Sequence, residues 1–98
     1  MTYSRENVTQ VLQPVFNSYG VNKAVLFGSI SSDTNTPNSD IDIMVDSGLK
    51  GLAFFGLLED VCGLFDCPVD MIDVQDIIPG SRIDNEIKRT GVTIYERA

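Results

Sequence analysis

Two aspartates in an alternating segment are the residues of this chain best suited to chemistry. Asp40-Ile41-Asp42-Ile43 alternates polar and apolar side chains, and in a strand this period of two places both carboxylates on one face. Their Cα atoms would then lie about 7 Å apart, close enough for the carboxylates to share a divalent cation. Two bare like charges about 5 Å apart near a protein surface repel by about 3 kcal/mol. The pair therefore favours a bound hard metal ion over a simple wet strand face.

A Gly-Ser pair precedes the aspartates and suits a phosphate group. Gly28-Ser29 follows the apolar run 24–27 and is separated from Asp40 by ten residues. Glycine lets the backbone come close to a ligand, and the N–H groups of a following helical turn favour anions. Ser29 adds a hydroxyl donor, although serine caps helices in the same geometry without binding a ligand. Facing a Mg²⁺ site, such an element would serve metal-assisted phosphoryl or nucleotidyl transfer.

With this spacing, the chain resembles the minimal nucleotidyltransferases (MNT) of the DNA polymerase beta superfamily, whose signature is Gly-Ser, ten residues and Asp-x-Asp. The resemblance implies an α+β fold with a small mixed sheet of about four strands packed with helices. It implies a Mg²⁺-dependent transfer of a nucleoside monophosphate, AMP from ATP, to a hydroxyl acceptor. Gly28 and Ser29 would hold the phosphates of ATP, and Asp40 and Asp42 the metal ions. The expected protein partner is a HEPN-type toxin, for which the chain would act as antitoxin.

The resemblance also implies a third carboxylate on a neighbouring strand, for which Asp70 and Asp73 are the candidates. Their odd separation places them on opposite faces of an extended strand, so both cannot point at one metal ion. Val69-Asp70-Met71 matches the family's pattern of an acid between hydrophobic residues, and we favour Asp70 as catalytic residue and metal ligand. A single bulge would reverse this choice in favour of Asp73.

One departure from the family supports a second interpretation. Ile30-Ser31-Ser32-Asp33 carries no basic residue where members of the family commonly have arginine. Lys50, Arg82, Lys88 or Arg89 could supply the missing cation from elsewhere. The alternative is therefore a catalytically weak binding module that neutralises its partner by contact alone.

Composition narrows the class of substrate. The chain has 98 residues, enough for one small domain, and a net charge of −7. Between Ala24 and Ser81, nine Asp and one Glu stand against the single base Lys50, which disfavours long nucleic acid as a substrate. Histidine is absent from the sequence, which excludes imidazole base catalysis. We expect a cytoplasmic protein with no membrane span, whose Cys62 and Cys67 are reduced and buried.

Hydrophobic periodicity and turn residues predict the order helix, strand, strand, helix, strand, helix, strand. An amphipathic helix is expected over 5–19, where Pro14 should kink or split it near Gln13 and Gly20 should end it. An apolar helix packed as core is expected over 52–65, and a helix opened by a Ser81/Asp84 capping box over 81–90. If one face of the 52–65 helix stays exposed, it becomes a candidate partner surface. The expected strands cover 21–27, 40–45, 68–74 and 92–95, with a short helical turn from Ser29 and a polar loop over 31–39.

Overall fold

A four-stranded mixed sheet forms the centre of the computed structural model, which describes residues 4–28 and 40–97. The strands are β1 (Lys23–Phe27), β2 (Ile41–Asp46), β3 (Val69–Asp73) and β4 (Val92–Glu96), in the spatial order β3-β2-β1-β4. β1 runs antiparallel to both of its neighbours, whereas β2 and β3 are parallel. The parallel pair needs a crossover, and the helix between these two strands supplies it. The predicted α+β fold with a small mixed sheet is confirmed.

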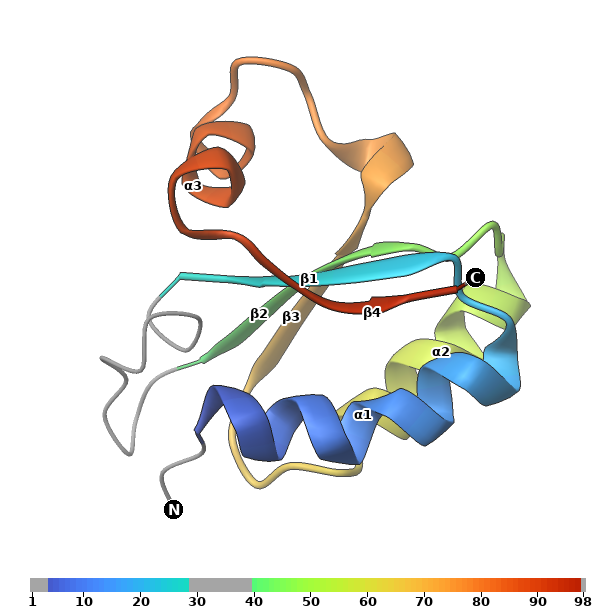
Figure 1. The fold of residues 1–98 in the computed structure, drawn as a ribbon. Coiled ribbons are helices and arrows are strands. Elements are labelled where there is room, and N and C mark those ends of the chain that lie inside the picture. Colours follow the sequence, from blue (N-terminus) through green and yellow to red (C-terminus); the bar gives the residue numbers. More distant parts are fainter. Residues whose placement is uncertain (1–3, 29–39, 98) are drawn as a thin grey trace.

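The helices lie on both faces of the sheet (Figure 1). α1 (Arg5–Tyr19) and α2 (Leu52–Cys62) cover one face, and α3 (Arg82–Thr90) lies over the other. The core fills the space between the sheet and the first two helices. It includes Val8, Leu12, Phe16, Leu26, Ile41, Ile43, Val45, Leu57 and Val61, all at most 1% exposed. In β2, Ile41, Ile43 and Val45 enter this core, so the alternate residues Asp42, Met44 and Asp46 face the side of α3.

The caps of α1 agree with the sequence, and its proline does not split it. The Ser4 side chain accepts a hydrogen bond from the Asn7 N–H at the start of the helix, and Gly20 ends it in the left-handed conformation (φ 71°). Of the two expected effects of Pro14, a kink or a split near Gln13, the split is wrong, since α1 is one helix from Arg5 to Tyr19 with Pro14 inside it. Pro14 is exposed, and the helix is held on the core by Val8, Leu12 and Phe16. Their burial outweighs the loss of one backbone hydrogen bond.

α2 is a helix as predicted, but it is core on one side only. It buries Leu57 and Val61, whereas Leu52 and Phe55 are 88% and 60% exposed. The expectation of a helix packed as core therefore holds for one side of α2, and the exposed side is the case in which we expected a candidate partner surface. α2 lies beside α1 at the end of the sheet near β3, so only one side of its surface meets protein. The predicted burial of Cys62 is wrong for the same reason, because this thiol lies on the exposed side of α2, and Cys67 is only partly buried.

Ends of elements differ from prediction by one to three residues. The first strand begins at Lys23, because the N–H of Val21 still bonds to Phe16 of α1. α2 ends at Cys62, and a short 3-10 turn, Val74–Asp76, follows β3. In the described part of the chain, none of the helices combines the length and the apolar character that a membrane span requires. Ser29 and the predicted turn and loop over 30–39 lie outside the described residues.

Candidate functional site

Phe27, Asp42 and Asp70 form one row across three adjacent strands. Phe27 of β1 pairs with Asp42 of β2, which in turn pairs with Asp70 of β3. Directly paired residues of neighbouring strands point to the same face of the sheet, here the face covered by α3. The parallel register of β2 and β3 thus places two carboxylates side by side. Asp40 immediately precedes β2 and is exposed.

The surroundings of Asp42 raise the pKa of its carboxyl group. Burial, followed by the charges of Asp70, Asp40 and Glu86, raises the pKa of Asp42 to about 6 from its ordinary 3.8. No cation is among the groups that act on this pKa. The acidic neighbours destabilise the ionised form of this carboxyl group, and a positive ion placed between the acids would stabilise it. Perturbed acids in a cavity are typical of functional sites.

Oxygen ligands of this kind fit a hard cation such as Mg²⁺, with Asp42 and Asp70 as the paired donors and Asp40 beside them. Among residues 4–28 and 40–97, no three Asp, Glu, His or Cys side chains are drawn together into a preformed ion site. The arrangement is therefore a pair of adjacent carboxylates with a third acid at the start of the strand.

Gly28 is in close contact with Asp42. Its φ of +76° is a left-handed conformation that favours glycine, and a Cβ at this position would lie 2.6 Å from Oδ2 of Asp42. The N–H of Gly28 donates to Oγ1 of Thr90 (2.9 Å), which itself donates to the backbone oxygen of Glu86 (2.8 Å). The turn after β1 is thereby held by the C-terminal end of α3. A glycine is needed at position 28 because its backbone lies so close to the carboxylate of Asp42 that a side chain would not fit.

Asp73, the other candidate for the third acid, is tied into the scaffold. It is 4% exposed and pairs with Val45, whose side chain lies in the core on the opposite face of the sheet. Its Oδ2 accepts from Oγ of Ser47 (2.5 Å) and its Oδ1 from the N–H of Gln75 (3.1 Å). Asp73 thus fixes the turns that follow β2 and β3, and it does not face Asp42. Asp70 is the residue that the register brings to Asp42.

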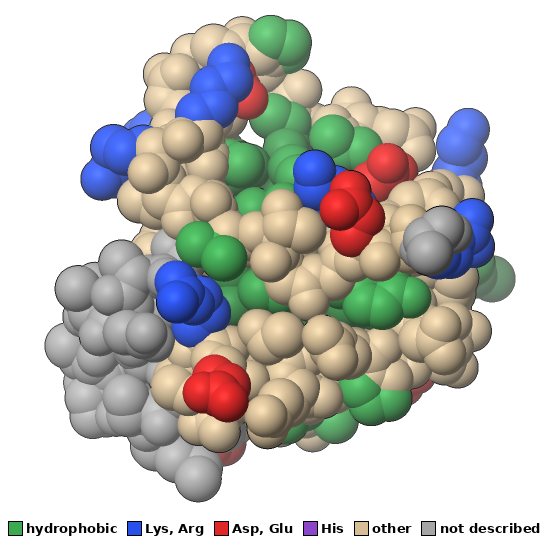
Figure 2. All heavy atoms as spheres, viewed as in Figure 1, with side chains coloured by type: hydrophobic (Ala, Val, Ile, Leu, Met, Phe, Trp, Pro, Cys, Tyr) green, Lys and Arg blue, Asp and Glu red, His purple; other side chains and the backbone are tan. Residues whose placement is uncertain are grey.

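A cavity of about 530 Å³ opens over the carboxylate row, between β3 and α3. α3 contributes Arg82, Ile83 and Glu86 to its lining, and α2 contributes Leu58. The sheet contributes Phe27, Asp42, Val69, Asp70, Met71 and Ile72. Figure 2 shows hydrophobic side chains exposed in the hollow beneath α3. Among the described residues that line the cavity, Arg82 is the only basic one. The cavity thus combines the carboxylates of Asp42 and Asp70 on the sheet with the guanidinium of Arg82 on α3.

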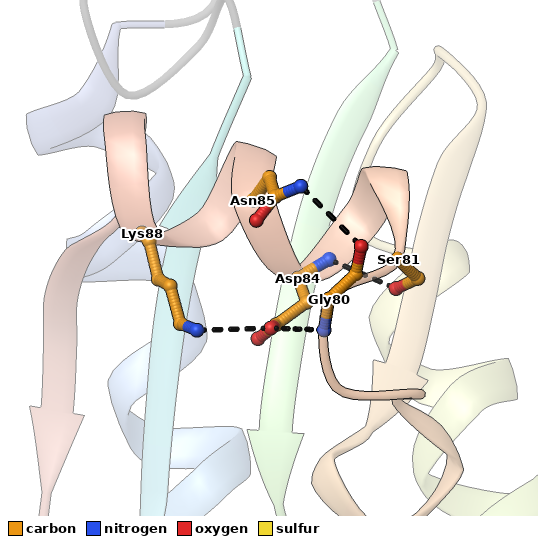
Figure 3. A network of polar contacts seen from close by, with 5 residues as sticks. All are labelled: Gly80, Ser81, Asp84, Asn85 and Lys88. Atoms are coloured by element: carbon orange, nitrogen blue, oxygen red, sulfur yellow. Dashed lines mark hydrogen bonds and ion pairs between the residues drawn. The ribbon is translucent and has the colours of Figure 1, made fainter.

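The first turn of α3, which carries Arg82, is fixed by a capping network (Figure 3). Oγ of Ser81 accepts from the N–H of Asp84 (3.2 Å), as the capping box predicts. Oδ2 of Asp84 accepts from the N–H of Gly80 (2.8 Å) and pairs with Nζ of Lys88 (3.0 Å). Nδ2 of Asn85 reaches the oxygen of Gly80 (3.4 Å). These contacts hold the start of the helix and with it the position of Arg82.

Sequence reasoning missed two residues of the site. Thr90 and Glu86 give no local signal of function, since both read as ordinary polar residues of an exposed helix. Their roles come from the packing of α3 over β1, which brings Thr90 to Gly28 and Glu86 to the cavity. Arg82 was one of four candidate cations, and it alone of the four lines this cavity. Ser29 lies outside the described residues.

Comparison with known proteins relates this architecture to one family. The family model described as "Polymerase beta, Nucleotidyltransferase" matches residues 10–98. A comparison with curated proteins found no match. Among solved structures, a chain of a toxin–antitoxin crystal structure with AMP-PNP superposes with a TM-score of 0.74 at 22% identity, covering 91% of this chain and 73% of that one. A chain of the Shewanella oneidensis complex of a tri-AMPylated HEPN toxin with an MNT antitoxin gives a TM-score of 0.69 at 18% identity, covering 95% and 73%.

Proposed function

The chain belongs to the polymerase beta nucleotidyltransferase family, and we propose that it transfers AMP from ATP to a hydroxyl group of a protein partner in a Mg²⁺-dependent reaction. The observation that carries this proposal is the in-register pairing of Asp42 with Asp70 beneath the cavity. Two adjacent carboxylates that repel each other are suited to bind the Mg²⁺ ion that accompanies the phosphates of a nucleotide.

In the proposed reaction, Asp40, Asp42 and Asp70 hold Mg²⁺ when it is bound, and the metal would offset the charge that develops on the attacking and leaving oxygens. Gly28 and Ser29 hold the β- and γ-phosphates. The acceptor hydroxyl gives its proton to Asp70 as its oxygen forms a bond to the α-phosphorus, and the bond from this phosphorus to the bridging oxygen breaks, which releases pyrophosphate. Asp70 is the more exposed of the paired acids, so it also orients the acceptor hydroxyl. The chain thereby contributes position and charge rather than a nucleophile.

For the partner, we propose a HEPN-type toxin, with this chain as the antitoxin. The support is the family together with the likeness in fold to chains of toxin–antitoxin complexes, one of them with an AMPylated HEPN toxin. A net charge of −7 also suits a basic protein partner better than nucleic acid.

A contact-only binding module is the second candidate. The exposed apolar side chains of α2, Leu52 and Phe55, favour it, because a side chain of this size that is left uncovered is suited to a protein interface. Asp42→Asn separates the two candidates. If this variant still neutralises a co-expressed HEPN toxin whose mass shows no added AMP, neutralisation is by contact. If neutralisation and the added mass are lost together, it is by transfer.

The first test of the site is thermal unfolding with and without Mg-ATP. Ligand at about one hundred times Kd should stabilise the wild type by about 2.7 kcal/mol, a rise of roughly ten degrees or more in Tm. Asp40→Asn/Asp42→Asn should abolish the rise. Asp46→Asn, which removes an acid from the same strand outside the cavity lining, is the matched control and should keep it. Equal responses of the double variant and the wild type would refute the metal role of these carboxylates.

A further inference from the structure

The guanidinium of Arg82 is exposed and uncommitted. Among the described residues, no hydrogen bond or ion pair engages it, whereas the two other bases of α3 are paired, Lys88 with Asp84 (3.0 Å) and Arg89 with Glu86 (3.1 Å). Arg82 also lines the cavity over the carboxylate row. A planar, weakly hydrated cation in this position is available to a ligand at no cost in broken contacts.

α3 places Arg82 and Gly28 on opposite sides of the carboxylates. The last residue of the helix, Thr90, holds the N–H of Gly28, and Glu86 lies near enough to act on the charge of Asp42. Arg82 lies one further turn away, about 6 Å along the axis from Glu86 and about 12 Å from Thr90. A ligand that extends from Gly28 across Asp42 therefore reaches Arg82 at its far end.

Aliphatic side chains make up much of the wall around Arg82. Ile72 lies two residues beyond Asp70 on the same face of β3, and Ile83 follows Arg82 on α3. A second cavity of about 270 Å³ shares Ile72, Arg82 and Ile83 with the first and adds Ile77 and Ile78 together with the polar residues Asp76 and Ser81. A guanidinium beside aliphatic side chains suits a flat aromatic ring, which can stack on the cation and contact the hydrocarbon walls.

We propose that Arg82, Ile72 and Ile83 form the subsite for the nucleobase of the bound nucleotide, with the guanidinium stacked on the base. This rests on the proposed function, which puts the β- and γ-phosphates at Gly28 and the α-phosphate at Asp42. In a nucleoside triphosphate the base lies at the opposite end from these phosphates. Arg82 begins α3, whereas Gly28 is bonded to Thr90 at the end of the helix, so Arg82 is the cavity-lining residue of α3 that lies farthest along the helix from Gly28.

Calorimetric titration of the whole chain with Mg-ATP and with Mg-tripolyphosphate tests this subsite, because the second ligand has the phosphates but lacks the base. Wild type should bind Mg-ATP more tightly than Mg-tripolyphosphate. Arg82→Ala should weaken Mg-ATP by about five- to thirtyfold, the lower part of the range for loss of a stacking partner, and leave Mg-tripolyphosphate within about twofold. Arg82→Lys keeps the charge but loses the plane, so it should behave like Arg82→Ala.

Lys50→Ala is the control, because it removes an exposed base that does not line this cavity and takes no part in the capping network of α3, and it should change neither affinity. Equal weakening of both ligands by Arg82→Ala, with recovery in Arg82→Lys, would assign Arg82 to a phosphate and overturn the subsite. Unchanged Mg-ATP affinity in Arg82→Ala, or equal wild-type affinities for the two ligands, would also overturn it while the proposed function stands. A wild type that binds neither ligand would overturn both.

Discussion

Neutralising Asp42 should stabilise the protein in the absence of metal, although it removes a residue that we assign to function. Burial and the neighbouring acids raise the pKa of Asp42 to about 6, so the folded state holds its proton more tightly than the unfolded chain, where the pKa is near 3.8. Between these two values the wild type loses stability as the pH rises, because folding must give up the advantage of the protonated form. Above the folded pKa the loss is complete.

The magnitude follows from the same two values. At 1.36 kcal/mol for each pH unit, the difference corresponds to about 3 kcal/mol at most. Asp42 is only partly buried, and solvent screening lowers this figure, so we expect Asp42→Asn to gain about 1–3 kcal/mol at pH 7.5 in EDTA. For a chain of this size, each kcal/mol raises Tm by about 4–8 °C. Below about pH 4 the difference between the two proteins should shrink, and it should vanish at about pH 3, where Asp42 is protonated in both states.

Urea or thermal unfolding of wild type and Asp42→Asn at a series of pH values from about 3.5 to 8 measures this difference. Asp46→Asn, at the end of β2, controls for the general relief of net negative charge and should show a smaller difference without a step between pH 4 and 6. Mg²⁺ should stabilise the wild type and thereby reduce the difference in free energy of unfolding between it and Asp42→Asn. A variant that is less stable than wild type at pH 7.5, or a difference independent of pH, would refute the account of Asp42 as a carboxylate disfavoured by burial and like charge.

Three further substitutions test the surroundings of Asp42 and the roles of the two acids of β3. Gly28→Ala should lower the free energy of unfolding by at least about 1–2 kcal/mol, because a left-handed alanine is strained and its Cβ would lie 2.6 Å from Oδ2 of Asp42. Urea unfolding of Gly28→Ala/Asp42→Ala should show that part of this loss is recovered when the carboxylate is removed as well. If the effects of the two substitutions simply add, the contact between Gly28 and Asp42 is refuted. Asp73→Asn should lower the free energy of unfolding by about 1–3 kcal/mol, because an amide N–H₂ would face the N–H of Gln75 or the donors of Ser47. Asp70→Asn should leave the free energy of unfolding unchanged or raise it, and it should abolish the rise in Tm that Mg-ATP produces. The opposite pattern in the two variants would exchange their assigned roles.

Local signals in the sequence were sufficient for the elements and for much of the family assignment. The caps Gly20 and Ser81 lie where predicted, because a cap depends on neighbours within one turn. Alternation in 40–45 predicted which residues of β2 enter the core, since a strand has a fixed period of two. The Gly-Ser and Asp-x-Asp spacing led to the nucleotidyltransferase family that the comparison confirms.

Long-range packing decided the remainder. The choice between Asp70 and Asp73 depends on the register of β3 against β2, and Pro14 could remain inside α1 only because the core holds that helix. The exposure of Leu52 and Phe55 follows from the position of α2 at the end of the sheet, which no periodicity reveals. Period and capping are properties of adjacent residues and can be read from the chain. The row of Phe27, Asp42 and Asp70 and its cover by α3 exist only where segments far apart in sequence pack together, and therefore only the tertiary structure could establish them.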